Sequence, residues 1–228
     1  NIMGFYRGPN IVTDGLVFAV DPGSTRSYPG SGTTTTNIIN GASGTLTNGV
    51  AYVTNNGGAF DFDGTDDYIA FPDDTNLNNQ TLTMESWVKL DSTLYQDAFI
   101  FEKGQVNTQY SNFVATNGYL YFRTIGLSTN DKALNLTSYT SAGLWTHITC
   151  TYGAGIKYIY INGVLRATQT GLTGTISTNT TGLFLGAYGP GSSYFMDGKI
   201  AVSRVYNKAL TQAEVTQNFN AQKSRFGL

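Results

Sequence analysis

The chain has 228 residues, of which 40% are hydrophobic and 13% aromatic, a composition that supports a packed core and excludes intrinsic disorder. Only 12% of the residues are charged, the formal net charge is −2 and no run of Lys or Arg occurs, so the basic surface expected of a partner of nucleic acids or anionic membranes is missing. At this length one all-β domain is the default expectation.

Disulfide frameworks and zinc sites are excluded by residue counts. The chain has one cysteine and one histidine, Cys150 and His147, whereas an internal disulfide needs two cysteines and a Cys/His zinc site needs more ligands than these two. Any structural metal would therefore be bound by oxygen atoms. No apolar run approaches 18 residues and residues 1–4 show no signal-peptide pattern, which predicts a soluble chain without membrane insertion.

The elements can be predicted in chain order. Residues 1–13 have no periodicity and are predicted to form an N-terminal arm. Residues 23–58, rich in Gly, Thr and Asn, are predicted to form a long irregular excursion tucked onto the sheets. Short runs rich in Val, Ile, Tyr, Phe and Thr predict strands at 16–20, 60–62, 68–71, 81–90, 99–102, 111–115, 119–124, 145–152, 157–161, 164–168, 182–186 and 199–206.

Two Asn-Gly dipeptides predict hairpins. Asn162-Gly163 separates two predicted strands, and this dipeptide favours a type I′ turn because both central residues need positive φ. Asn117-Gly118 is a second, weaker signal of the same kind. Many such strands without intervening helical patterns predict an all-β fold, in which two antiparallel sheets form a jelly-roll sandwich.

One short helix is predicted near the C-terminus, over about residues 211–222. Thr211 and Glu214 have the spacing of a capping box, in which each side chain bonds to the backbone of the other residue. The sandwich with this helix is assigned to residues 14–222. Residues 223–228 are predicted to form a C-terminal tail.

Catalytic residues are sparse. Only three glutamates occur, and the Glu-x-Asp-x-x-Glu string that supplies paired carboxylates in many sandwich glucanases is absent. Glu102, beside Phe99, is the one candidate for an acid with a raised pKa, and a strand-end ion pair with Lys103 is the alternative. His147 and Cys150 lie three residues apart on one predicted strand and therefore point to opposite faces. We expect no enzyme, no catalytic residue and no cofactor.

The densest acidic stretch runs from Asp61 to Asp67 and is followed by Asp73 and Asp74. Calcium prefers hard oxygen ligands of this kind, but the ligand spacing of an EF-hand is missing. Asx turns that join two strands explain the same residues. No metal is assigned from this stretch.

Four ordered motifs resemble those of LamG-like domains of the concanavalin A-like lectin/glucanase superfamily. They lie at residues 60–69, at 82–89, at 145–148 with 159–163, and at 195–211, and the resemblance covers roughly residues 14–221. It implies a concanavalin A-like sandwich. It leaves function open, because lectins, glycan-binding modules, glycosidases and structural domains share this fold.

One position departs from that family. Many members carry an Asp-Glu pair in the final strand, where this chain has Ala201 and Val202. Because such an Asp often serves calcium in related sandwiches, the resemblance does not carry that site over. Calcium stays open, and the remaining candidate cation ligands are Asp21, Asp63, Asp66, Asp67 and Asp197.

Both ends of the chain, residues 8–17 and 217–228, resemble LamG-like proteins encoded by tailed bacteriophages. This resemblance implies a non-enzymatic protein of the virion surface, serving in capsid decoration, as a fibre or in adhesion. It further implies an oligomer that contacts other virion proteins through its terminal arms and has a host-surface glycan as candidate ligand. The alternatives are a purely cementing protein, a lectin module outside a virus and a glycosidase.

A candidate ligand-binding surface follows from one strand. Tyr119, Tyr121 and Arg123 alternate and share a face, while Phe122 takes the other. Sugar sites combine aromatic faces with a few placed polar groups. The predicted ligand-binding residues are Tyr110, Asn112, Tyr119, Tyr121 and Arg123, and the alternative is that these tyrosines cap the core.

Overall fold

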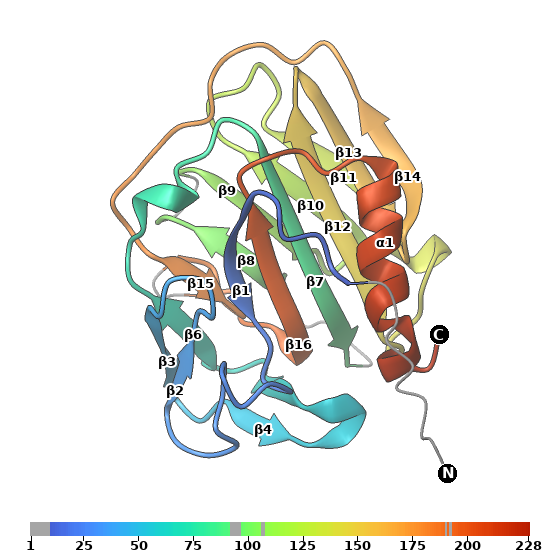
Figure 1. The fold of residues 1–228 in the computed structure, drawn as a ribbon. Helices are drawn as coiled ribbons and strands as arrows, with labels where there is room; N and C mark the ends of the chain where they lie inside the picture. The colour runs from blue at the N-terminus through green and yellow to red at the C-terminus, as the bar shows by residue number, and fades with distance from the viewer. Residues whose placement is uncertain (1–9, 92–96, 106–107, 190, 192) are drawn as a thin grey trace.

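A computed structural model describes residues 10–91, 97–105, 108–189, 191 and 193–228 (Figure 1). The strands of the first sheet are β1 (Leu16–Val20), β4 (Ala51–Val53), β5 (Ala59–Asp63), β7 (Leu82–Leu90), β12 (Thr146–Gly153), β13 (Ile156–Ile161), β14 (Val164–Gln169) and β16 (Asp197–Tyr206). Those of the second sheet are β2 (Thr34–Thr36), β3 (Ser43–Thr47), β6 (Tyr68–Phe71), β8 (Ala98–Lys103), β9 (Tyr110–Val114), β10 (Tyr119–Thr124), β11 (Asp131–Asn135) and β15 (Leu183–Leu185). The helices are α1 (Gln212–Gln222) and four 3-10 turns, η1 (Asn55–Gly57), η2 (Thr75–Leu77), η3 (Leu136–Ser138) and η4 (Lys223–Phe226).

The two sheets form an antiparallel sandwich. The first has the order β14-β13-β12-β7-β16-β5-β4, with β1 paired to another part of β16, and the second has the order β11-β10-β9-β8-β15-β6-β3-β2. The jelly-roll sandwich with one short C-terminal helix is therefore confirmed. Every strand pair within the described ranges is antiparallel, as expected for a chain that returns through short turns instead of crossover helices.

All twelve predicted strands are present, each with ends within two residues of the prediction. The prediction of a wholly irregular segment at 23–58 is wrong, because β2, β3 and β4 lie in it. These strands are only three to five residues long, too short to show alternation, and β2 and β3 consist mostly of Thr, Gly and Ser. The sequence also did not predict β11, whose residues include Asp, Lys and Asn and which is defined by its pairing with β10.

Both predicted hairpins are present. Asn162 and Gly163, with φ of 52° and 75°, join β13 to β14, which is the pair of positive φ values that a type I′ turn requires. In the turn between β9 and β10, Gly118 has φ of 80° and the Ala115 N–H donates to the Tyr119 carbonyl at 2.9 Å. The second turn determines the register that places β10 beside β9.

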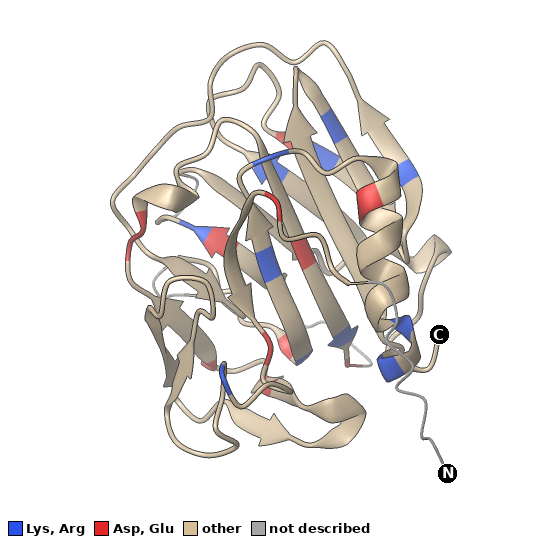
Figure 2. Cartoon of the chain, viewed as in Figure 1, with Lys and Arg blue, Asp and Glu red and all other residues tan. Residues whose placement is uncertain are grey.

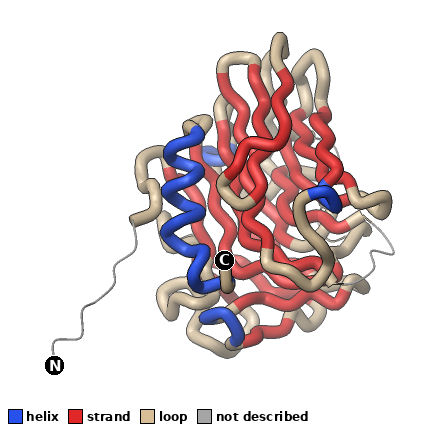
Figure 3. The backbone as a smooth tube through the Cα atoms, turned by 90° about the vertical axis from the view of Figure 1, so that its right-hand side faces the viewer, coloured by secondary structure: helices blue, strands red, loops and turns tan. Residues whose placement is uncertain are grey.

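The core lies between the sheets, and α1 covers the outer face of the first sheet (Figures 1 and 3). On β7, Leu82 and Met84 enter the core, whereas Trp87 points outward and is nevertheless fully buried. Its ring stacks on Phe219 of α1 at 5.7 Å and on Phe226 of η4 at 4.1 Å. Both helices therefore protect this face from water.

A buried charge network joins α1 to the sheet. The Glu85 carboxylate accepts hydrogen bonds from Arg204 Nη1 at 2.5 Å and from Asn218 Nδ2 at 2.6 Å. Burial alone would raise the pKa of Glu85, but the Arg204 guanidinium, His147 and Asn218 together bring it to about 2. His147 packs between Trp87 and the helix, on the opposite side of β12 from the core residue Cys150, so these two residues do not pair, as predicted.

The predicted helix cap is confirmed. Thr211 Oγ1 accepts from the Glu214 N–H at 3.3 Å, and the Glu214 carboxylate accepts from the Thr211 N–H at 2.8 Å. Lys208 Nζ donates to the same carboxylate at 2.7 Å. Although partial burial opposes it, Lys208 and the cap hydrogen bonds lower the pKa of Glu214, which has a structural role.

The chain ends are part of the sandwich where the structure describes them. The predicted C-terminal tail is wrong, because η4 buries Phe226 and Arg225 Nη1 binds the Asp21 carboxylate at 2.9 Å. The sequence pattern missed this segment since a single apolar residue shows no periodicity. Residues 1–9 of the predicted arm lie outside the described residues, and Val12 is buried with its N–H donating to Asn218 Oδ1 at 2.7 Å.

Figure 2 shows Lys and Arg spread over many elements instead of gathered on one face. This distribution agrees with the absence of basic runs in the sequence. In the described part of the chain, no helix is both long and apolar enough to cross a membrane.

Candidate functional site

The outer face of the second sheet carries the predicted ligand-binding residues of β10. Tyr119 is 38% exposed, and Tyr121 and Arg123 are half-buried on the same side, whereas Phe122 is fully buried on the core side. The predicted alternation of β10 is therefore confirmed. Because α1 and η4 lie on the first sheet, they leave this surface uncovered.

Two predicted residues lie elsewhere. Tyr110 and Asn112 of β9 are completely enclosed on the core side of the sheet, so neither belongs to an outer binding surface. The Tyr110 hydroxyl donates to the Leu77 carbonyl at 3.1 Å, and burial raises its pKa. The strand register explains this position. Ser111 pairs with Arg123, and paired residues lie on the same side of a sheet, so the odd-numbered residues of β9 face outward and the even-numbered ones face the core. No pattern within one strand could reveal this parity.

A cluster of aromatic rings covers the middle of the outer face. Phe99 and Phe113 stack with centroids 4.4 Å apart, and Phe113 and Tyr121 stack at 5.1 Å, with interplanar angles of 9° and 8°. Tyr188 and Tyr194 come from the segment after β15 and lie 4.7 and 6.3 Å from Phe99. Phe99 is buried, whereas Tyr194 is 42% exposed, so tyrosine rings form the water-facing layer.

We call this surface the tyrosine face, and define it by Phe99, Glu102, Ser111, Phe113, Tyr121, Arg123, Asp131, Tyr188 and Tyr194. Its polar residues lie in one cross-strand row. Asp131 pairs with Arg123, Arg123 with Ser111, and Ser111 with Glu102. Rings and hydrogen-bonding groups thus lie side by side on one sheet surface.

A β-bulge places Phe99 and Glu102 on the same side of β8. The two residues are three apart, so strict alternation would put them on opposite faces. The register shifts between Phe99 and Phe101, where one extra residue, Ile100, is inserted and points into the core. The sequence carries no visible signal for this shift, and the Glu102 site could not be predicted from it.

Glu102 is the buried acid of the tyrosine face. It is 2% exposed, and its Oε2 has no hydrogen-bond partner in the described part of the chain. Burial raises its pKa to about 8, even though the Ser111 hydroxyl and Arg123 act in the opposite direction. The predicted ion pair with Lys103 is wrong, because Lys103 points away and binds Asp73 at 2.9 Å. At neutral pH the carboxyl is therefore mostly protonated and can both donate and accept.

Arg123 and Asp131 form a two-pronged ion pair beside the rings. Arg123 Nε donates to Oδ1 at 2.8 Å and Nη2 to Oδ2 at 2.9 Å. The guanidinium carbon lies 5.0 Å from the centroid of the Phe113 ring. The hydrogen bond to Asp131 raises the pKa of Arg123, although burial opposes it. Both oxygens of the carboxylate are occupied by this arginine.

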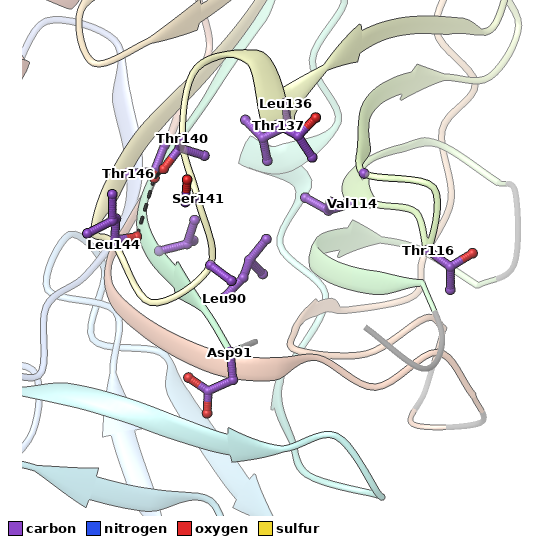
Figure 4. A pocket seen from close by; sticks show the side chains of 13 residues that line it. Leu90, Asp91, Val114, Thr116, Leu136, Thr137, Thr140, Ser141, Leu144 and Thr146 are labelled. Atoms are coloured by element: carbon purple, nitrogen blue, oxygen red, sulfur yellow. Dashed lines mark hydrogen bonds between the residues drawn. The ribbon is translucent and has the colours of Figure 1, made fainter. Parts of the chain in front are cut away.

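A separate pocket of about 340 Å³ opens between the ends of the two sheets (Figure 4). Figure 4 shows Leu90, Val114 and Leu136 around the space, with Thr140 and Ser141 at the loop that precedes β12. The sequence carries no signal for this pocket, because its walls come from both sheets. The described residues of its lining are mainly aliphatic and hydroxyl-bearing, and none of them is aromatic.

The acidic stretch forms a turn. Asp63 Oδ1 accepts from the Thr65 N–H at 2.8 Å, and Asp67 Oδ2 accepts from the Asp63 N–H at 3.1 Å, as predicted for Asx-type turns. Ligand atoms of Asp63, Asp66 and Asp67 lie within 4.8 Å of one another, and burial raises the pKa of Asp67. An all-oxygen set suits a hard cation. The carboxylates of Asp63 and Asp67 already accept hydrogen bonds within the turn. We assign no metal to this stretch.

Comparison with known proteins identifies the family. The family model described as concanavalin A-like lectin/glucanases superfamily matches residues 63–216. The chain belongs to this superfamily. No curated protein matches the sequence significantly.

Solved structures share the concanavalin A-like fold at low identity. A sialidase of Trypanosoma rangeli has a TM-score of 0.69 and 15% sequence identity over 94% of this chain. The structure of the same enzyme in complex with sialic acid has a TM-score of 0.70 and 14% sequence identity over 94% of this chain. A mutant of HCR/D has a TM-score of 0.72 and 15% identity over 93% of this chain. This chain spans 34% of the sialidases and 53% of HCR/D, so the likeness concerns the fold of one part of those proteins.

Proposed function

We propose that this concanavalin A-like chain is a non-enzymatic glycan-binding module whose binding surface is the tyrosine face. The observation that carries the proposal is the layer of partly exposed rings of Tyr121, Tyr188 and Tyr194, which packs on the stacked Phe99 and Phe113 beside the Arg123–Asp131 pair. Pyranose rings present apolar C–H surfaces and hydroxyl groups together. An aromatic platform next to partly exposed groups that donate and accept hydrogen bonds, here Arg123 and Asp131, matches both features.

The carboxylates of this surface support a binding role over hydrolysis. Glycosidases of the common type use two carboxyl groups, one as acid and one as base or nucleophile. Glu102 has the raised pKa of an acid, but both oxygens of Asp131 are held by Arg123. The other two glutamates of the sequence lie in the network under α1 and in the helix cap.

Our proposal includes the virion surface as the location, with an oligomer that contacts other virion proteins through its terminal arms. The support for these points is the resemblance of residues 8–17 and 217–228 to phage-encoded LamG-like proteins. They stay predictions.

Glycan binding is tested by comparing tyrosine variants on a glycan array and by titration. Tyr121→Ala and Tyr188→Ala are expected to weaken binding about tenfold or more, as truncation of an aromatic anchor commonly does. Tyr139→Ala is the matched control, since Tyr139 is 37% exposed and packs against Arg166, which is not part of the tyrosine face. Equal affinity in all three variants, or no glycan bound by the wild type, would contradict the proposal.

A further inference from the structure

Recognition of an anionic sugar needs a cation that its acid group can reach. Arginine is the strongest such partner, because its planar fork of N–H donors binds the two oxygens of a carboxylate or sulfate together. Among the described residues that define the tyrosine face, Arg123 is the one cation. Its guanidinium carbon lies 5.0 Å from the centroid of the buried Phe113 ring, and its side chain shares one side of β10 with the half-buried Tyr121.

Neighbouring lysines are directed elsewhere. Lys132 lies opposite Phe122 in the register of β11 and β10, and so belongs to the other side of the sheet. Lys157 is fully buried beneath the sheet, where its Nζ donates to the carbonyls of Phe122 and Asn130. Neither lysine lies on the side of β10 and β11 that carries Arg123 and Asp131.

Asp131 already takes the position that a ligand carboxylate would need. Its two oxygens accept from Nε and Nη2 of Arg123 at 2.8 and 2.9 Å, which is the arrangement used to bind an acid group. An anionic ligand that binds this edge of the guanidinium would have to displace Asp131, and at any other edge it would lie beside the negative charge of Asp131. The pair is also formally neutral, so it offers no net attraction to an anion.

We infer that the tyrosine face selects neutral sugars and rejects sialylated, uronic and sulfated ones, because Asp131 occupies the guanidinium of Arg123. The inference rests on the proposed glycan-binding function and adds its substrate class. Asp131 is thereby a specificity-determining residue that acts through Arg123.

The test uses the whole chain and pairs of glycans that differ by one acid group, such as lactose and sialyllactose, across an array of neutral cores. Wild type is expected to bind neutral members and to show at least tenfold weaker binding of their acidic partners. Asp131→Ala removes the carboxylate that pairs with Arg123 and is expected to improve binding of the acidic members about tenfold, the effect of one charge-assisted contact. The double variant Arg123→Ala with Asp131→Ala is expected to lose that gain.

Each outcome is decisive. Wild-type preference for acidic members, or no gain with Asp131→Ala, overturns the inference while glycan binding itself stands. Binding of no glycan overturns the proposed function and the inference with it. Asp131 is partly exposed on a paired edge strand, so its loss has little effect on folding, and thermal melting checks this. If Asp131→Ala is unfolded, Asp131→Asn, which keeps the shape and removes the charge, takes its place.

Discussion

Glu102 makes the stability of the protein depend on pH, and Glu102→Gln is expected to remove that dependence. The pKa of this carboxyl rises from an ordinary value of 4.5 to about 8 in the folded protein, mainly through burial. The unfolded chain releases the proton near pH 4.5, while the folded protein holds it until about pH 8. Between these values the folded state binds more protons, so the stabilising contribution is complete below pH 4.5 and is lost as the pH rises through 8.

The magnitude follows from the two pKa values. A pKa that moves from 4.5 to about 8 corresponds to proton binding that is tighter by roughly 5 kcal/mol in the folded state. Between pH 5 and pH 9 the wild type is therefore expected to lose about 4 kcal/mol of unfolding free energy relative to the glutamine variant. Glutamine has a similar shape and is never ionised, so the contribution of residue 102 to the unfolding free energy no longer depends on pH.

The assay is urea denaturation of both proteins at several pH values from 5 to 9. The difference between the two curves isolates residue 102, because every other titrating group is present in both proteins. The unfolding free energy of the variant is expected to increase relative to that of the wild type as the pH rises. This difference changes most steeply below pH 8. Parallel curves would refute the reasoning, since they would mean that the carboxyl ionises equally easily in the folded and unfolded states.

Two further substitutions test the packing of the first sheet and α1. Phe226→Ala removes the ring that packs against Trp87 and Trp145 and is expected to reduce the unfolding free energy by about 3 kcal/mol, with a red shift of the tryptophan fluorescence; an unchanged emission spectrum would contradict this packing. Tyr206→Phe removes a buried hydroxyl that accepts from Asn218 at 2.9 Å, and a loss of about 1–2 kcal/mol is expected in the same denaturation assay. Tyr139→Phe, at an exposed site, is its control, and an equal effect in both variants would show that the buried hydroxyl contributes nothing.

Local patterns were sufficient wherever a few neighbouring residues decide the structure. Asn162-Gly163 encodes its turn because both residues tolerate positive φ, and Thr211 with Glu214 encodes the start of α1 because their side chains bond to nearby backbone. Alternation in β10 likewise assigned Tyr119, Tyr121 and Arg123 to one face. Each of these predictions depends on residues within a few positions of one another.

Predictions that needed contacts between distant segments failed or were not possible. Tyr110 and Asn112 were assigned to the ligand surface, yet the pairing of β9 with β10 turns both into the core. The C-terminal tail was predicted from its lack of periodicity, yet Phe226 and Arg225 bind partners that are distant in sequence. A single apolar residue or charge carries no sign of its partner until the chain is folded.

The amino-acid sequence by itself determined the fold class, the positions of twelve strands, the hairpins and the capped helix, because alternation, turn residues and caps are local properties of the chain. Only the tertiary structure decided which strand faces share a surface. The bulge in β8 brings Phe99 and Glu102 to one side, and the strand register brings Arg123 to Asp131 and Ser111. Burial then changes the chemistry of Glu102, since the cost of removing a carboxylate from water depends on what the folded chain packs around it.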